Sequence, residues 1–587
     1  MRLEDLGLIG NCQFSALVER NGSVVWCCLP RFDSEPVFGA LLDSSGGEFS
    51  ICSSSGVTGH QTYLENSNIL ETVFDAPDGR FRVIDFAPRF HQYGRMFRPT
   101  QLVRIIEPLA GTPSIRARCE PRLGWRKAVP QTLQGSNHVR FEGYASPLRL
   151  TSDVSLSYLS GQPFALAQRR HFVLAWGPPV EEDLPALCEH YLSETLRYWQ
   201  GWVKHCNIPT LYQKEVIRSA LALKLHCYED TGAIVAAMTT SIPEAPGSGR
   251  NWDYRYCWLR DSYYVLDALR LLGHFEEREH FIQYLLNITA NSEKLDLHPL
   301  YRVDGGSDLE EKVLSDWSGF NGDGPVRIGN AAATHAQHDV FGEMVLALAP
   351  IFLDERFSQE CTPTALALIE RLARKAIGVA GTPDAGIWEF RKAWQPQTFS
   401  SLMCWAAAER VARIAERHRP HDAVEFKAAA ERIHAEIVDQ AWNRDLGSFV
   451  DAYGGQHFDA SLLQMAPLRF LTTTDPRLIG TVDAVRRELA RDGWLMRYRT
   501  DDGLGMPSTA FVMCTFWLVE ALVATARADE AREVMSRLHE VLSPLGLMAE
   551  DYDVGNRRLW GNFPQAYSHV GLIRAAFAAS PPWGELL

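Results

Sequence analysis

The spacing of apolar residues changes once along the chain, near residue 180. Before that point, short runs rich in β-branched and aromatic residues are separated by turn pairs such as Asn21-Gly22 and Asp78-Gly79, a pattern typical of antiparallel strands. After it, apolar residues recur at helical spacing to the end of the chain. The sequence therefore predicts a β domain followed by a helical one. The predicted strands include 15–18, 23–28, 81–85, 102–106 and 154–159.

Twelve helical segments are predicted in the second part of the chain. They fall near 212–228, 261–274, 277–292, 330–353, 363–379, 399–418, 421–442, 459–470, 475–491, 510–527, 528–543 and 564–580. Twelve helices form six hairpins, which fit an (α/α)6 barrel whose rim loops build a site. An α-solenoid is the alternative, but no short repeat period supports it. We expect an antiparallel β-sandwich over 1–180, a helical linker over 181–208 and the barrel over 209–587.

Composition narrows the possible partners and the location. The net charge of −14 provides no basic face for nucleic acid, and a neutral ligand is easier to accommodate. No run of apolar residues is long enough to span a membrane, and the N-terminal residues do not resemble an export signal. The 12 cysteines are scattered without a Cys-x-x-Cys spacing. We therefore expect a cytoplasmic protein without a metal or organic cofactor, whose oligomeric state the sequence leaves open.

The segment 251–261, Asn-Trp-Asp-Tyr-Arg-Tyr-Cys-Trp-Leu-Arg-Asp, holds four aromatic rings and four charges. Aromatic rings stack on the C–H faces of sugars, and Arg260 and Asp261 supply fixed donors and acceptors for hydroxyl groups. An ordinary helix N-terminus with an acidic first turn is the equally weighted alternative. The segment is a candidate sugar site, with Tyr256 and Trp258 among its rings.

Two glutamates in predicted loops are candidates for acid–base chemistry. Glu389 lies between two aromatic residues after a glycine-containing turn, where partial burial would raise its pKa as a general acid requires. Glu550 lies in an acidic loop before a predicted helix. The alternatives are a surface ion pair with Arg391 for Glu389 and a solvated acidic loop for Glu550. Two such carboxylates are the minimum for glycoside hydrolysis.

A metal site is the less favoured interpretation of another polar cluster. His335, His338, Asp339 and Glu343 lie close together on one predicted helix but miss the His-Glu-x-x-His pattern. A structural or sugar-facing role is favoured for them.

Several motifs together resemble glycoside hydrolase family 15. They are NWDYRYCWLRDS (251–262), RIGNAAATHAQHDVFGE (327–343), GIWEFR (386–391), FDASLL (458–463) and GNFPQAYSHVGLI (561–573). This inverting family includes glucoamylases, glucodextranases and microbial trehalases. Residues 6–34 are similar to the opening of its bacterial trehalase-like members. The resemblance follows the order of the chain over nearly its whole length.

The resemblance implies a β-sandwich followed by an (α/α)6 barrel, and single-displacement hydrolysis of an α-glucosidic bond that releases β-glucose. Glu389 would be the general acid and Glu550 the general base, with their carboxyl groups roughly 6.5 to 9.5 Å apart. The expected substrate-binding residues, by motif or by place in 251–261, are Arg260, Asp261, Trp258, Trp388, Arg497, Tyr256 and Ser568.

The resemblance favours trehalose as substrate. Maltooligosaccharides or isomalto-linked glucans are the next choice, and a non-catalytic sugar-binding or regulatory protein on the same fold is the alternative of another class. The chain departs from the family pattern at His335, at Ser508 and Thr509, and at Phe390, positions that could line the subsite beyond the cleaved bond. A loop of the β domain, over 11–14 or 31–34, would shorten the site if it reached over the barrel mouth.

Overall fold

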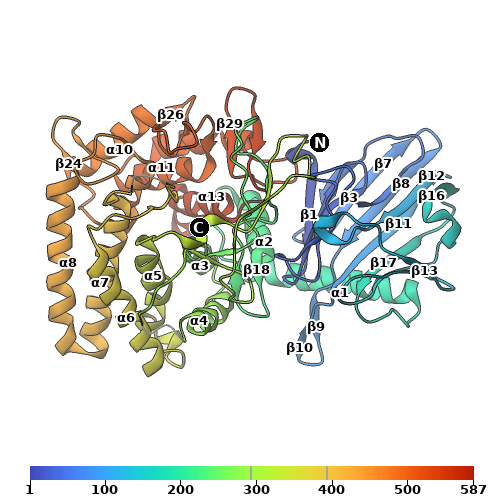
Figure 1. Ribbon diagram of the computed structural model, residues 1–587, viewed down its shortest axis with the longest axis horizontal. Coiled ribbons are helices and arrows are strands. Elements are labelled where there is room, and N and C mark those ends of the chain that lie inside the picture. The colour runs from blue at the N-terminus through green and yellow to red at the C-terminus, as the bar shows by residue number, and fades with distance from the viewer. Residues whose placement is uncertain (291–293, 392–393, 587) are drawn as a thin grey trace.

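The computed structural model of the protein describes residues 1–290, 294–391 and 394–586 (Figure 1). Two parts lie side by side along the longest axis. The N-terminal part is built of antiparallel sheets and the C-terminal part of helices. The expected order of a β domain and then a helical domain is confirmed.

Residues 1–180, all of which the structure describes, contain two large antiparallel sheets. The predicted strands at 15–18, 23–28, 81–85 and 102–106 are confirmed within them. One sheet has seven strands: β1 (Leu6–Gly10), β2 (Ser15–Glu19), β3 (Ser23–Cys28), β4 (Pro36–Phe38), β5 (Glu48–Ser53), β12 (Ser114–Glu120) and β16 (Ser160–Ala165). The other has eight: β6 (His60–Tyr63), β7 (Leu70–Ala76), β8 (Gly79–Phe86), β11 (Gln101–Gly111), β13 (Thr132–Gln134), β14 (His138–Phe141), β15 (Leu148–Ser152) and β17 (Arg170–Trp176).

A buried arginine ties the two sheets together. Arg104 on β11 forms an ion pair of 2.7 Å with Asp85 on the neighbouring strand β8. Its other nitrogens donate to the carbonyls of Phe49 on β5 and of Gly22 in the turn between β2 and β3, and all three strands belong to the seven-stranded sheet. A buried charge is tolerated when it is paired and fully hydrogen-bonded. Arg104 therefore fixes how the sheets pack.

The predicted strand at 154–159 is wrong. Residues Leu156–Tyr158 form a 3₁₀ turn, and β16 begins only at Ser160. The Ser152 hydroxyl accepts a hydrogen bond from Val154 N at 3.0 Å, and the Asp153 carboxylate accepts one from His171 N at 2.8 Å. These side-chain hydrogen bonds take the place of ladder bonds after β15, so the apolar run turns instead of extending.

Twelve α-helices follow the connecting helix α1 (Leu184–Lys204) in the described part of the chain. Each of the twelve predicted segments overlaps one of them, so their existence is confirmed. They are α2 (Gln213–His226), α3 (Leu259–Leu271), α4 (Glu276–Thr289), α5 (Asp339–Leu353), α6 (Pro363–Val379), α7 (Thr398–His418), α8 (Pro420–Ala441), α9 (Met465–Leu468), α10 (Pro476–Leu489), α11 (Val512–Ala524), α12 (Ala528–Met535) and α13 (Ala566–Ala579).

The helices contact one another in a closed order. Helix α3 contacts α5, α5 contacts α7, α7 contacts the turn η6 (Ala460–Gln464) that leads into α9, this turn contacts α11, α11 contacts α13, and α13 contacts α3. Helices α2, α4, α6, α8, α10 and α12 each contact members of this ring. Within the described residues, no helix is both long and apolar enough to cross a bilayer.

Three predicted helices differ from the observed ones, and the end of another lies outside the described residues. The segment 528–543 is α-helical only over Ala528–Met535, and a 3₁₀ turn follows at Leu538–Glu540. The segment 330–353 is helical only from Asp339, because the Asn330 side chain caps a 3₁₀ turn and the Asp384 carboxylate accepts a hydrogen bond from His338 N at 2.9 Å. In 459–470 the Asp459 side chain starts the 3₁₀ turn η6, and only four residues are α-helical. The predicted end of 277–292 falls at 291–292, which the structure does not describe.

Candidate active site

A narrow cavity in the helical domain brings several of the predicted site residues together. Its walls come from four separate segments, which are loops or helix starts. The cavity volume is about 60 Å³. The lining residues are Glu244, Arg250, Trp252, Tyr254, Trp258, Asn330, Ala332, His335, Trp388, Glu389, Phe390, Arg391, Arg497, Asp502 and Leu504.

Glu389 reaches this cavity from a strained turn. Its backbone φ is +53°, a conformation that non-glycine residues adopt rarely and that costs on the order of 1–3 kcal/mol. Glu389 N donates to Gly386 O at 3.1 Å, which closes the turn. About a fifth of the Glu389 side chain is solvent-exposed, 21%. Such strain at a cavity-lining acid indicates a functional position.

The pKa of Glu389 is set by two opposing effects. Burial raises the pKa above the ordinary glutamate value, and the Arg260 guanidinium lowers it. Arg260 Nη1 donates to Glu389 Oε1 at 2.6 Å. The alternative that Glu389 is a surface acid paired with Arg391 does not hold, because Arg391 pairs with Glu311 at 2.9 Å.

Arg260 and Asp261, at the start of α3, lie behind Glu389. Arg260 Nε donates to Asp261 Oδ2 at 3.1 Å, and the guanidinium also donates to Ile387 O and lies over the Tyr567 ring. Asp261 is buried, and its Oδ1 has no hydrogen-bond partner among the described residues. A buried carboxylate oxygen without a partner is costly unless a ligand satisfies it.

Two tryptophans form part of the walls. Trp388 Nε1 donates to Asp459 Oδ2 at 2.7 Å, which fixes the ring beside Glu389. Burial raises the pKa of Asp459 to about 6. Trp258 is 2% exposed, meets the Tyr254 ring edge-on at 5.2 Å, and its Nε1 lacks a partner within the described part of the chain. Both rings line the cavity.

Glu550 is buried beside the cavity, 2% exposed. Burial is the largest cause of a pKa raised well above the ordinary value, and the Asp551 and Glu244 charges act in the same direction. The Arg497 guanidinium and a hydrogen bond with Tyr254 lower the Glu550 pKa. Glu550 is therefore not in a solvated acidic loop. It directly precedes β29 (Asp551–Asp553), in a short sheet that the sequence did not predict.

A glycine leaves room for the Glu550 side chain. Gly561 has φ of +77°, and a Cβ at this position would lie 2.7 Å from Glu550 Cβ and 2.9 Å from Glu550 Oε2. Thr509 Oγ1 donates to Asp551 Oδ1 at 2.9 Å. Burial raises the pKa of Asp551 to about 8. Glu550 and Asp551 thus form a coupled pair of buried carboxyl groups.

Arg497 belongs to a network of charged side chains. Arg497 was predicted from the sequence as a site residue, but its neighbours Glu244 and Arg250 were not. The Arg497 guanidinium forms an ion pair with Glu244 and lies 5.9 Å from the Trp388 ring centroid. Arg250 Nε donates to Glu244 Oε2 at 2.6 Å, and Arg250 Nη2 lies 2.7 Å from Asp502 Oδ2. Glu244 and Arg250 flank the segment Ala-Pro-Gly-Ser-Gly, which reads as a loop and carries no signal for a buried charge.

Besides Arg260, Asp261 and Glu550, which lie behind the cavity walls, Tyr256 and Ser568 are predicted site residues that do not line the cavity. The Tyr256 hydroxyl accepts a hydrogen bond from Gly329 N at 3.1 Å, and this side chain lines a different cavity between the domains. Ser568 Oγ donates to Ala549 O at 2.8 Å, one residue before Glu550. Ser568 thus contacts the backbone that carries Glu550.

The polar cluster on α5 faces the Arg260 region. Asp339 and Glu343 are fully buried, and burial raises the pKa of Asp339 to about 8. Arg260 is the principal positive charge acting on both carboxyl groups. Within the described residues, no group of three or more His, Cys, Asp and Glu side chains is arranged to hold a metal ion. His335 lies away from them, lining the cavity beside the Trp394 ring.

The β-domain loops 11–14 and 31–34, which the sequence left as candidates for covering the site, do not line this cavity. Asn11 donates to Pro88 O and Pro99 O within the β domain. Arg31 and Asp33 contact Asp304 and Val303 at the domain interface. All the residues that line the cavity belong to the helical domain.

One glutamate among aromatic rings at a cavity, with a second buried glutamate beside it, supplies the two carboxyl groups that glycoside hydrolysis requires. The chain belongs to glycosyl hydrolases family 15, whose model matches residues 210–577. Residues 1–159 match a domain described as trehalase-like, N-terminal. The protein is thus a glycoside hydrolase of this family.

Similar proteins cover nearly the whole chain. A trehalase of Mycobacterium tuberculosis is 35% identical, over 98% of this chain and 89% of that protein. A trehalase of Thermoplasma volcanium is 33% identical, over 97% of this chain and 92% of that protein. A bacterial glucoamylase structure, in complex with acarbose, shares the fold with a TM-score of 0.66 at 14% identity, covering 98% of this chain and 94% of that chain.

Proposed function

We propose that the protein is an inverting hydrolase of trehalose that releases β-glucose, with Glu389 as general acid and Glu550 as general base. The observation that carries this assignment is the contact of Glu389 with Arg260 at a cavity whose wall residue Tyr254 bonds to Glu550. The trehalases among its relatives, similar over nearly the full chain, support the choice of trehalose.

Glu389 protonates the glycosidic oxygen in this mechanism. Burial raises its pKa, which favours the protonated form that an acid catalyst needs, and the partial exposure of its side chain allows contact with the leaving oxygen. As the C–O bond breaks, the bonding pair goes to that oxygen, which takes the Glu389 proton. The leaving glucose departs as an alcohol.

Glu550 removes a proton from the water that attacks the anomeric carbon from the opposite face. The new C–O bond forms as the old one breaks, so the configuration inverts. Catalysis requires an ionised Glu550, and burial beside Asp551 opposes ionisation. Arg497 and Tyr254 offset this by stabilising the carboxylate.

The remaining predicted residues bind the sugar or position those that do. Arg260 and Asp261 bind hydroxyl groups of the non-reducing glucose, Trp258 and Trp388 stack on its faces, and Arg497 provides a further donor. The free Oδ1 of Asp261 and the free Nε1 of Trp258 support these roles. We assign Ser568 to positioning, because it bonds to the backbone next to Glu550. Tyr256 likewise supports the wall behind Trp258.

The closed order of helix contacts supports an (α/α)6 barrel as the architecture of the helical domain. We place a β-sandwich over residues 1–180, the helical linker over 181–208 and the barrel over 209–587. The two large sheets end at Trp176, α1 covers Leu184–Lys204, and α2 begins at Gln213, which supports these boundaries.

A cytoplasmic location is part of the proposal. All 12 cysteines are free, which supports a reducing compartment.

A substrate panel tests the proposed function. Trehalose, maltose, isomaltose and kojibiose are incubated with the protein, and glucose release is followed enzymatically. The proposal expects trehalose to give the highest kcat/KM. Faster release from maltose or isomaltose would assign a glucoamylase or glucodextranase activity, and no release from any of them would leave a sugar-binding protein.

A further inference from the structure

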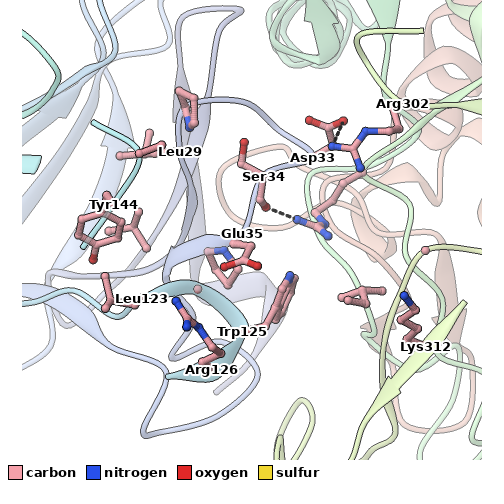
Figure 2. A pocket seen from close by; sticks show the side chains of 18 of the residues that line it. Leu29, Asp33, Ser34, Glu35, Leu123, Trp125, Arg126, Tyr144, Arg302 and Lys312 are labelled. Carbon is pink, nitrogen blue, oxygen red and sulfur yellow. Dashed lines mark hydrogen bonds and ion pairs between the residues drawn. The ribbon is translucent and has the colours of Figure 1, made fainter. Parts of the chain in front are cut away.

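A second cavity lies at the interface of the two domains, separate from the one that holds Glu389 (Figure 2). Its volume is about 550 Å³, within the range of roughly 300–1,000 Å³ of ligand pockets. Glu35, Trp125 and Arg126 of the β domain face Arg302 and Lys312 of the helical domain across it.

The walls combine balanced charge with aromatic rings. The basic lining residues are Arg126, Arg255, Arg302 and Lys312, and the acidic ones are Asp33, Glu35, Asp308 and Glu310. Because the two signs cancel, the cavity does not select an ion of either charge. The rings of Trp125, Tyr144, Trp176 and Tyr256 add apolar faces. Paired donors and acceptors beside aromatic faces suit a neutral ligand rich in hydroxyl groups.

In the β-domain wall, one acidic and one basic side chain are available to a ligand. Within the described residues, Glu35 and Arg126 are exposed and form no hydrogen bond or ion pair with another side chain or the backbone. Gly124 makes the room for Glu35, because a Cβ there would stand 1.7 Å from Glu35 Oε2. Arg255, in contrast, is fully engaged by Asp253 and Ser34 O.

The two cavities share one wall. Arg255 and Tyr256 line the interdomain cavity, whereas Tyr254 and Trp258 of the same segment line the catalytic one. The segment 328–332 divides in the same way, with Gly329 on one side and Asn330 and Ala332 on the other.

A third segment of the wall links the two cavities through an ion pair. Glu310 and Lys312 face the interdomain cavity, whereas Glu311 between them pairs at 2.9 Å with Arg391 of the catalytic cavity. A ligand that moves residues 310–312 would therefore also move Arg391 in the wall of the catalytic cavity.

We propose that the interdomain cavity is a second saccharide-binding site, which takes a neutral saccharide of one or two hexose units. Occupancy of this site acts on the catalytic cavity through the shared wall. The coupling is reciprocal, so a sugar in either cavity changes the affinity of the other.

Equilibrium dialysis of the full-length protein with glucose tests the site. The wild type is expected to bind two glucose molecules per chain. The double variant Glu35→Ala/Arg126→Ala is expected to lose one of them, with affinity at the interdomain cavity weakened at least tenfold, because two charged hydrogen-bond partners are removed. The control Glu65→Ala/Arg116→Ala removes two exposed side chains of the same types elsewhere in the β domain and should bind as the wild type does.

Three further measurements separate this site from the catalytic one. Arg260→Ala should lose the catalytic glucose and keep the interdomain one. Glucosamine and gluconate should bind to the interdomain cavity of Arg260→Ala more weakly than glucose. Glucose should also slow hydrogen exchange in the 123–126 segment of the wild type.

Unchanged glucose binding in Glu35→Ala/Arg126→Ala, without protection of 123–126 in the wild type, would overturn the proposal. Tighter binding of gluconate or glucosamine than of glucose would overturn its ligand class. Neither outcome touches the hydrolytic assignment, which the substrate panel tests.

Discussion

Arg260 Nη1 lies 2.6 Å from Glu389 Oε1, although the two residues are 129 positions apart in the sequence. This contact joins the start of α3 to the strained turn before α7. It places a permanent positive charge beside a carboxyl group whose pKa burial raises. Arg260 thereby holds the Glu389 carboxyl group in one position and lowers its pKa.

Replacing Glu389 with Gln should lower kcat about 10²- to 10⁴-fold while the fold is retained, since the proton donor is lost and the side-chain volume is kept. The measurement is the steady-state rate of glucose release, with circular dichroism as the check on folding. Glu533→Gln, an exposed acid on α12 that lines neither cavity, is the matched control and should retain activity. Near-normal turnover in Glu389→Gln would remove Glu389 from the mechanism.

Asp551→Asn should move the acid limb of the kcat/KM–pH profile to lower pH. The Asp551 charge raises the pKa of Glu550, so its removal lets Glu550 ionise at lower pH. The asparagine oxygen can still accept the Thr509 hydrogen bond. Asp553→Asn, two residues along β29, should leave the limb in place. An unshifted limb in Asp551→Asn would show that Glu550 does not control it.

Gly561→Ala should lower both stability and turnover. The alanine Cβ would stand 2.7 Å from Glu550 Cβ at a φ of +77°, so the backbone cost of about 1–2 kcal/mol adds to displacement of the base. Thermal unfolding and kcat are the two readouts. Gly555→Ala in the same hairpin has its nearest neighbour at 3.4 Å and should be tolerated. Equal effects of the two substitutions would contradict the packing argument.

Asp339→Asn should flatten the dependence of stability on pH. In the folded protein burial raises the pKa of Asp339 to about 8, from about 3.8 in the unfolded chain. The contribution of Asp339 to stability is therefore full below pH 3.8 and is lost as pH rises through 8, by on the order of a few kcal/mol. Asparagine does not ionise. The melting temperature should fall between pH 4 and 8 more steeply in the wild type than in Asp339→Asn, whereas the exposed Asp308→Asn should follow the wild type. Parallel curves for wild type and Asp339→Asn would refute this.

The change of hydrophobic period near residue 180 was sufficient to predict the order of the domains, and the helical spacing after it predicted the helices. The aromatic residues and the glycine turn around Glu389 were sufficient only to nominate it as a candidate acid. The partners of Arg497 were not predictable, because Glu244 lies 253 positions earlier in the chain and its ion pair forms only when the rim segments meet. Local spacing also could not show which cavity Tyr256 lines. Tyr256 and Arg255 line the interdomain cavity, whereas Tyr254 and Trp258 line the catalytic one. Which side of a wall a residue faces is decided by tertiary packing.

The anomeric form of the first products tests the central claim most directly. Proton NMR of trehalose hydrolysis at early times should show β-glucose and α-glucose in equal amounts. The attacked glucose inverts to the β form, and the leaving glucose keeps its α configuration. Only α-glucose at early times would mean retention of configuration, and would contradict direct attack of a water activated by Glu550 with Glu389 as the acid.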